Sequence, residues 1–226
     1  MQLKKYAFLW GYMLLVLFDL ACGFEELSGF RILSKPLLLL SLLAYFVVQA
    51  QSRRNTTFYL MFGALFCSLL GDIFLLFENR SSLFFTLGLA AFLVAHLLFT
   101  LTFIKKWNKK KPSNFWLISV VLVAYGALLF YILKDSLGAL KVPVAVYILG
   151  ILAMVISAFR RKGYVPKSSF GLVFIGALFF VLSDSILAIN KFMVAIPLSH
   201  IFIMGTYATA QYLITKGILK QGDFDN

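Results

Sequence analysis

Two aspartates, Asp72 and Asp184, lie inside long apolar segments that have similar sequences. FGALFCSLLGDIFLLF runs from Phe62 to Phe77, and IGALFFVLSDSILAI runs from Ile175 to Ile189. A carboxylate within a membrane span is costly and commonly has a function. Two close carboxyl groups in a low-dielectric setting do not readily both ionise, so one keeps its proton. The pair therefore predicts a general acid beside a carboxylate. This combination suits hydrolysis through an oxocarbenium-like cation, as in glycosidases.

The same polar residues also allow a structural interpretation. Each aspartate could form a hydrogen bond between helices or a salt bridge to Lys35. His96 and His200 could each donate one interhelical hydrogen bond, and Asp19 could reach the lipid headgroups from the end of its helix. Both interpretations require helices that bring these side chains to similar depths.

The composition indicates an integral membrane protein. The 226 residues are 62% hydrophobic and 13% charged, whereas soluble domains are about 45–50% apolar and about 25% charged. Apolar runs of spanning length, roughly 17–25 residues, cover residues 6–23, 32–51, 57–77, 83–104, 114–133, 140–159, 168–189 and 195–215. We therefore expect an all-α polytopic protein with eight transmembrane helices in one domain over residues 1–226.

The distribution of Lys and Arg predicts the orientation in the membrane. Six of the 21 basic residues fall in loops on one side, and the other 15 fall on the side that carries both termini. The smaller group contains Arg31, Lys35, Arg80, Lys134, Lys141 and Lys191. The positive-inside rule places both termini in the cytoplasm. The net charge of +12 is therefore explained by topology and secondarily by contact with lipid headgroups, and no nucleic-acid partner is expected. The short basic loops favour a prokaryotic plasma membrane.

A parallel 4+4 internal repeat is expected from the order of unusual residues. A lysine shortly before a proline, then an aspartate, then a histidine occur twice, four helices apart. The first set is Lys35-Pro36, Asp72 and His96, and the second begins at Lys141 and Pro143, followed by Asp184 and His200. Each proline is expected to mark a helix start. Such a repeat would place the two aspartates across the centre of the protein, at one depth in the outer half of the bilayer.

Several segments together resemble the YhhN-type membrane proteins, a family that includes the vertebrate lysoplasmalogenases. The resemblance covers about residues 30–216 and rests on LLGDIFLLF, AHLLF, VPVAVYILGIL, GALFFVLSDSILAI and GTYATAQYLI, in that order. It implies an eight-helix membrane fold. It also implies hydrolysis of the vinyl ether bond of lysoplasmalogens, which are lysophospholipids with an ether-linked chain. The products are a fatty aldehyde and a glycerophosphoethanolamine or glycerophosphocholine.

The resemblance also assigns residues. It places the paired catalytic aspartates at Asp72 and Asp184, while Asp19 and His200 receive no role from it. Its other recurrent polar positions, which would bind substrate or water, are Lys35, His96, Tyr147, Ser183, Tyr207 and Gln211. Lys35 would hold the substrate phosphate. No metal or other cofactor is expected, because Cys22 and Cys67 lack the spacing of metal ligands.

Three other classes of protein fit parts of the sequence. A proton-coupled transporter would also have repeats, intramembrane carboxylates and short loops. An intramembrane aspartic protease would need a glycine-x-glycine-aspartate motif, which neither Asp72 nor Asp184 completes. A non-catalytic lipid-binding membrane protein is the third alternative.

Overall fold

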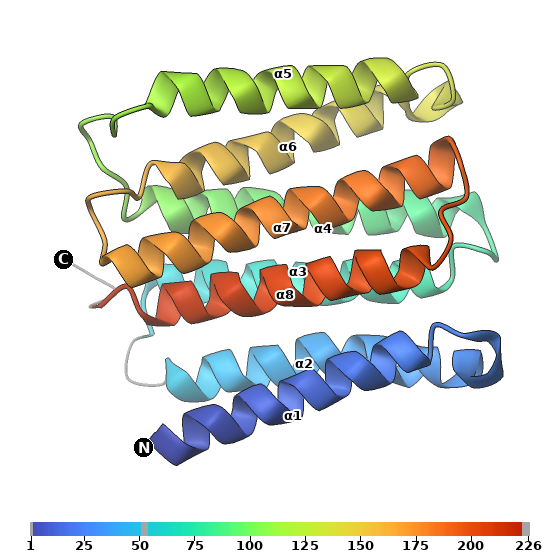
Figure 1. The fold of residues 1–226 in the computed structure, drawn as a ribbon, viewed down its shortest axis with the longest axis horizontal. Helices are drawn as coiled ribbons and strands as arrows, with labels where there is room; N and C mark the ends of the chain where they lie inside the picture. Colours follow the sequence, from blue (N-terminus) through green and yellow to red (C-terminus); the bar gives the residue numbers. More distant parts are fainter. Residues whose placement is uncertain (1, 51–53, 223–226) are drawn as a thin grey trace.

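The computed structural model describes residues 2–50 and 54–222, which form a bundle of roughly antiparallel helices (Figure 1). Within these residues there are eight α-helices and no strands. The helices are α1 (Gln2–Ala21), α2 (Arg31–Gln49), α3 (Thr56–Leu76), α4 (Ser82–Ile104), α5 (Phe115–Leu133), α6 (Lys141–Phe159), α7 (Lys167–Phe192) and α8 (Ser199–Leu219). Short 3-10 helices, η1 (Glu25–Phe30) and η2 (Gly138–Leu140), precede α2 and α6. Both termini lie at the same end of the bundle, on the left in Figure 1.

Six of these helices, α2 to α7, are long and apolar enough to cross a membrane. The apolar part of α1 is shorter, running from Ala7 to Ala21. The helix α8 differs for another reason, because it carries Tyr207, Gln211 and Thr215, all of which are buried inside the bundle. A helix with a polar interior face is less hydrophobic overall even when protein rather than water surrounds that face. The protein is an integral membrane protein.

The helices α3 and α4 are each capped at the N-terminus by a side chain of the preceding loop. The Asn55 side chain accepts a hydrogen bond from the backbone N–H of Phe58 at 3.0 Å, and Ser81 does the same for Leu83 at 3.3 Å. These bonds satisfy backbone donors that have no partner within the helix. They fix the starts of α3 and α4, which pack closely along each other.

The tightest pairs in the bundle are α3 with α4 and α7 with α8. Glycine permits the close approach of α7 and α8: a Cβ atom at Gly176 would lie 3.0 Å from both the carbonyl oxygen of Ala210 and the backbone nitrogen of Ile214. Small residues at such contacts are typical of helix packing in membranes. The central helices α4 and α6 also pack together. The helices that carry Asp72 and Asp184 are thus each held by one close partner.

Within the described residues, eight helices lie near the expected ranges and six of them are candidate membrane spans; two places differ from the prediction. The last helix was expected over 195–215, but it runs from Ser199 to Leu219, because residues 193–198 form the connection from α7. Pro36 was expected at a helix start, yet it is the sixth residue of α2. Pro36 has no N–H to donate to the carbonyl of Ile32, so the helix continues there with one bond fewer. Gln51, expected to end the second span, lies outside the described residues, as does Arg53.

Candidate active site

A polar cavity of about 370 Å³ lies between α2, α3, α7 and α8. Both aspartates line it, together with Arg31, Lys35 and Tyr207. It reaches the end of the bundle opposite the start of α1, because a residue of η1, residues of the α3–α4 connection and the first residues of α8 also contribute to its wall. The two carboxyl groups therefore share one space that also contains cationic side chains.

Asp72 has a cation and a hydroxyl as partners. Its Oδ1 lies 3.3 Å from the ammonium Nζ of Lys35 on α2, and its Oδ2 accepts a hydrogen bond of 2.8 Å from the hydroxyl of Tyr207 on α8. The Asp72 side chain is only 2% exposed. A buried carboxylate with an opposite charge and a hydrogen-bond donor is the arrangement that an ionised group requires.

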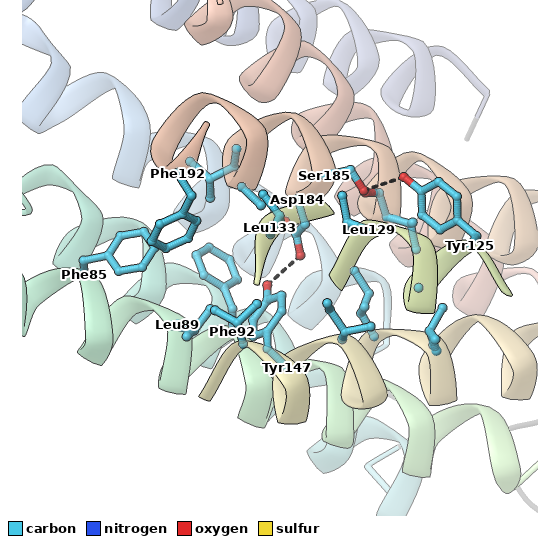
Figure 2. Close-up of a pocket in the computed structure, with 18 of the residues that line it drawn as sticks. Phe85, Leu89, Phe92, Tyr125, Leu129, Leu133, Tyr147, Asp184, Ser185 and Phe192 are labelled. Carbon is cyan, nitrogen blue, oxygen red and sulfur yellow. Dashed lines mark hydrogen bonds between the residues drawn. The ribbon is translucent and has the colours of Figure 1, made fainter. Parts of the chain in front are cut away.

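Asp184 has neutral partners. Its Oδ2 accepts a hydrogen bond of 2.5 Å from the hydroxyl of Tyr147 on α6 (Figure 2). The Nε2 atom of His96 on α4 lies 3.7 Å from the same oxygen, which is beyond hydrogen-bond length. No Lys or Arg whose side chain is described, in residues 7–50 and 54–222, forms an ion pair with Asp184. At 15% exposure, its side chain is the more accessible of the two.

The partners of the two aspartates come from corresponding helices. Asp72 on the third helix is contacted from the second and the eighth, and Asp184 on the seventh is contacted from the sixth and the fourth. Each helix of one set lies four places along the chain from its counterpart in the other set: the second from the sixth, the third from the seventh, and the fourth from the eighth. The two sets match helix by helix but not residue by residue, because aligning Pro36 with Pro143 places Lys35 at Val142 rather than at Tyr147.

The structure places the remaining predicted residues at different distances from the cavity. Ser183 lines it, but its hydroxyl donates to the carbonyl of Ile203 at 3.0 Å and so ties α7 to α8. His96 is fully buried behind Asp184, with its ring edge-on to Tyr147 and Phe180. Gln211 is fully buried one turn beyond Tyr207 and does not line the cavity. Neither ring nitrogen of His96 and neither amide atom of Gln211 has a hydrogen-bond partner among the described residues.

The two residues that received no role lie in contrasting places. Asp19 is buried and accepts a hydrogen bond of 2.6 Å from Ser34, and it does not line the cavity. The expectation that Asp19 reaches the lipid headgroups is therefore wrong: its carboxylate is turned inward onto α2. His200 does line the cavity, with its ring packed edge-on against Phe24.

Arg31 is a cavity residue that the sequence interpretation used only for topology. It begins α2 one turn before Lys35, so the two cations share a helix face. Its Nε is buried without a hydrogen-bond partner in the described part of the chain. The i, i+4 spacing of two basic residues beside an intramembrane aspartate is the signal that could have identified it. In the described part of the chain there is no group of three His, Cys, Asp or Glu side chains that could hold a metal ion.

Comparison with known proteins identifies the family. Lysoplasmalogenase TMEM86B of Homo sapiens is 35% identical over 196 residues, which cover 87% of this chain and 78% of the relative. Lysoplasmalogenase TMEM86B of Rattus norvegicus is 30% identical over 162 residues, covering 72% and 62%. The lysoplasmalogenase of Mycobacterium tuberculosis is 32% identical over 136 residues, covering 59% and 50%.

The chain thus spans most of the human relative, but less than two thirds of the rat and mycobacterial ones. No solved structure matches it. The sequence pattern of the YhhN family matches residues 30–218, which include the whole cavity except part of η1. On this match the chain belongs to the YhhN family.

Proposed function

We propose that the protein hydrolyses the vinyl ether bond of a lysoplasmalogen-type lysophospholipid, releasing a fatty aldehyde and a glycerophospho headgroup. The observation that carries this proposal is that Asp72, paired with a cation, and Asp184, paired with neutral groups, line one cavity. The names of the relatives at 30–35% identity support the same substrate class.

The different partners suggest which aspartate is the acid. Lys35 balances the charge of an Asp72 carboxylate, so Asp184, which has no cation beside it, is the group that holds the proton. Both described contacts of Asp184 are made by Oδ2, which leaves Oδ1 for the substrate. Asp184 is accordingly the general acid, and Asp72 is the carboxylate that stabilises the cation and activates water.

The reaction then balances in three steps. Asp184 transfers its proton to the alkenyl carbon beta to the ether oxygen, and the C=C electron pair forms the new C–H bond, leaving an oxocarbenium ion. Water adds to the carbon next to oxygen while Asp72 takes the water proton, which gives a hemiacetal. Asp72 returns that proton to the glycerol oxygen as the C–O bond breaks. Asp184 takes the hydroxyl proton of the hemiacetal, which releases the aldehyde and restores both groups.

The cationic wall suggests where the headgroup lies. Arg31 and Lys35 face the cavity from one side of α2, and His200 faces it from α8. Because Lys35 is paired with Asp72 at 3.3 Å, Arg31 is the better phosphate ligand, and its planar guanidinium suits phosphate oxygens. The family resemblance implied that Lys35 holds the phosphate. In this proposal Lys35 instead acts mainly on Asp72.

The proposed site implies an orientation. We propose that all eight helices cross the membrane, with the termini in the cytoplasm of a prokaryotic cell and the cavity in the outer half of the plasma membrane. The helices that carry the partners of Asp72 and Asp184 lie four places apart along the chain, which supports a parallel 4+4 repeat. Cysteine labelling of residues 105–114 from outside intact cells should fail if this orientation is right.

The test is aldehyde release by the purified protein in detergent supplied with lysoplasmenylethanolamine. We expect wild-type activity, its near loss in Asp72→Asn and Asp184→Asn, and no change in Asp135→Asn. Asp135 is a matched control because it is an exposed aspartate in the connection between α5 and α6. Full activity in either cavity variant would contradict the proposed mechanism.

The same preparation distinguishes the main alternatives. If no vinyl ether lipid yields aldehyde and proteoliposomes show substrate-dependent proton flux, the protein is a proton-coupled transporter. If the lipid binds with neither aldehyde release nor flux, it is a non-catalytic lipid-binding protein.

A further inference from the structure

A second, apolar pocket adjoins the polar cavity at Asp184 (Figure 2). Its volume is about 60 Å³, and it is enclosed by α4, α5, α6 and α7. The wall consists of hydrocarbon side chains such as Phe85, Leu89, Leu129, Leu133 and Phe192. The pocket is thus chemically unlike the cavity on the other side of the same carboxyl group.

The few polar groups of this pocket are already bonded. The hydroxyl of Tyr147 donates to Asp184, and the hydroxyl of Tyr125 donates to Ser185 Oγ at 2.7 Å, as Figure 2 shows. Ser185 in turn donates to the carbonyl of Val181 at 2.7 Å. Since these groups are satisfied within the protein, the pocket suits an apolar ligand rather than a polar one.

Asp184 and Phe92 line both spaces, together with Leu75 and Leu187. A ligand that occupied both would change from polar to apolar at Asp184. In a lysoplasmalogen, that change occurs at the enol ether bond, where the glycerol part ends and the chain begins. We propose that the apolar pocket holds the first carbons of the alkenyl chain and so aligns the C=C bond with Asp184. This inference rests on the proposed function.

The pocket volume limits what it can hold. One water needs about 10–15 Å³ on this measure, so a volume of about 60 Å³ accommodates a few carbons rather than a long chain. The rest of the chain must leave the bundle. The helix α5 forms the outer wall, lies at the edge of the bundle and is the least buried of the six candidate spans (Figure 1). It packs mainly on α6 and only sparsely on α7, so the chain leaves through the seam between α5 and α7 into the bilayer.

The experiment compares two substrates of different chain length. One is a lysoplasmenylcholine with a sixteen-carbon chain, and the other is its analogue with a two-carbon vinyl group, which ends at the carbon that receives the proton. Leu129→Trp narrows the pocket, and Leu128→Trp is the matched control, because Leu128 is the adjacent residue and 57% exposed. Ala188→Phe, on α7, is a second narrowing variant should the first not fold.

We expect Leu129→Trp to lower kcat/KM for the long-chain substrate at least tenfold relative to the vinyl analogue, and Leu128→Trp to leave the ratio unchanged. Equal losses for both substrates in Leu129→Trp and Ala188→Phe, or the same ratio change in Leu128→Trp, would overturn the proposal.

A binding measurement separates this proposal from the proposed function. A non-cleavable alkyl ether lysophospholipid with a diazirine on the fourth chain carbon should label peptides from α5 and α7. Labelling there without aldehyde release from any vinyl ether lipid would support the pocket while refuting hydrolysis. Aldehyde release with labelling confined to helices that do not line the pocket would support hydrolysis while refuting the pocket.

Discussion

Asp72 and Asp184 lie on the third and the seventh helix, within similar stretches of sequence, but their neighbours differ in charge. Asp72 has Lys35 and Tyr207, and its side chain is 2% exposed. Asp184 has Tyr147 and His96, and its side chain is 15% exposed. Helices of similar sequence thus present the same carboxyl group in two electrostatic settings, since the partner of Asp72 on α2 is a cation and the partner of Asp184 on α6 is a phenol. The partner residues, rather than the aspartates themselves, are therefore what makes the two carboxyl groups different.

The largest expected effect comes from replacing each aspartate by alanine. Loss of a general acid or base typically lowers rates about 10²–10⁴-fold. We therefore expect kcat for aldehyde release to be lower by a factor in this range in both Asp72→Ala and Asp184→Ala. Added formate should raise the rate of Asp72→Ala in proportion to its concentration, because a small carboxylate can bind beside Lys35. It should not restore Asp184→Ala, which lacks the proton donor. Rescue of Asp184→Ala alone would reverse the two roles.

The helices could be predicted because the physical cost of exposing backbone to hydrocarbon requires long apolar runs. Their ends were harder to predict. Residues 193–198 include Met193, Val194, Ile196 and Leu198, so hydropathy starts the last apolar run at 195, before Ser199, where α8 begins. The connection and the start of α8 depend on local geometry, which apolar composition does not specify.

The cavity could be predicted only in part. Lys35, Asp72 and Asp184 are conspicuous because charges are rare in spans, and the structure brings them to one cavity. Tyr125 gave no such signal, since it lies in an apolar helix and its contact with Ser185 depends on how α5 packs on α7. Gln211 shows the converse: the family resemblance assigned it to the site, but it is buried and does not line the cavity.

Replacing Lys35 by methionine should have the largest effect on stability. Removing one partner of a buried ion pair leaves an uncompensated charge and costs about 3–5 kcal/mol. The matched control is Lys191→Met, because Lys191 also pairs with a carboxylate, Glu78 at 3.1 Å, but both side chains are partly exposed. Such a surface pair contributes about 0–1 kcal/mol. Thermal unfolding in detergent should therefore show a large loss for Lys35→Met and a small one for Lys191→Met.

A double variant tests the cause of that loss. Lys35→Met combined with Asp72→Asn removes the charge that was left unpaired, so it should recover much of the stability lost in Lys35→Met alone. If the double variant is less stable than wild type by the sum of the two single losses, Asp72 does not depend on Lys35 for its charge.

The smallest effects on stability should come from replacing Tyr207 or Tyr147 by phenylalanine. Which of the two variants loses more stability indicates which aspartate is ionised. A hydrogen bond to a charged group contributes about 1.5–3 kcal/mol, whereas one to a neutral group contributes about 0.5–1.5 kcal/mol. Tyr207 donates to Asp72 at 2.8 Å and Tyr147 donates to Asp184 at 2.5 Å. If Asp72 is the carboxylate, Tyr207→Phe should lower the free energy of unfolding more than Tyr147→Phe, even though its hydrogen bond is the longer one. The reverse order would indicate that Asp184 carries the charge, and the acid would then be Asp72.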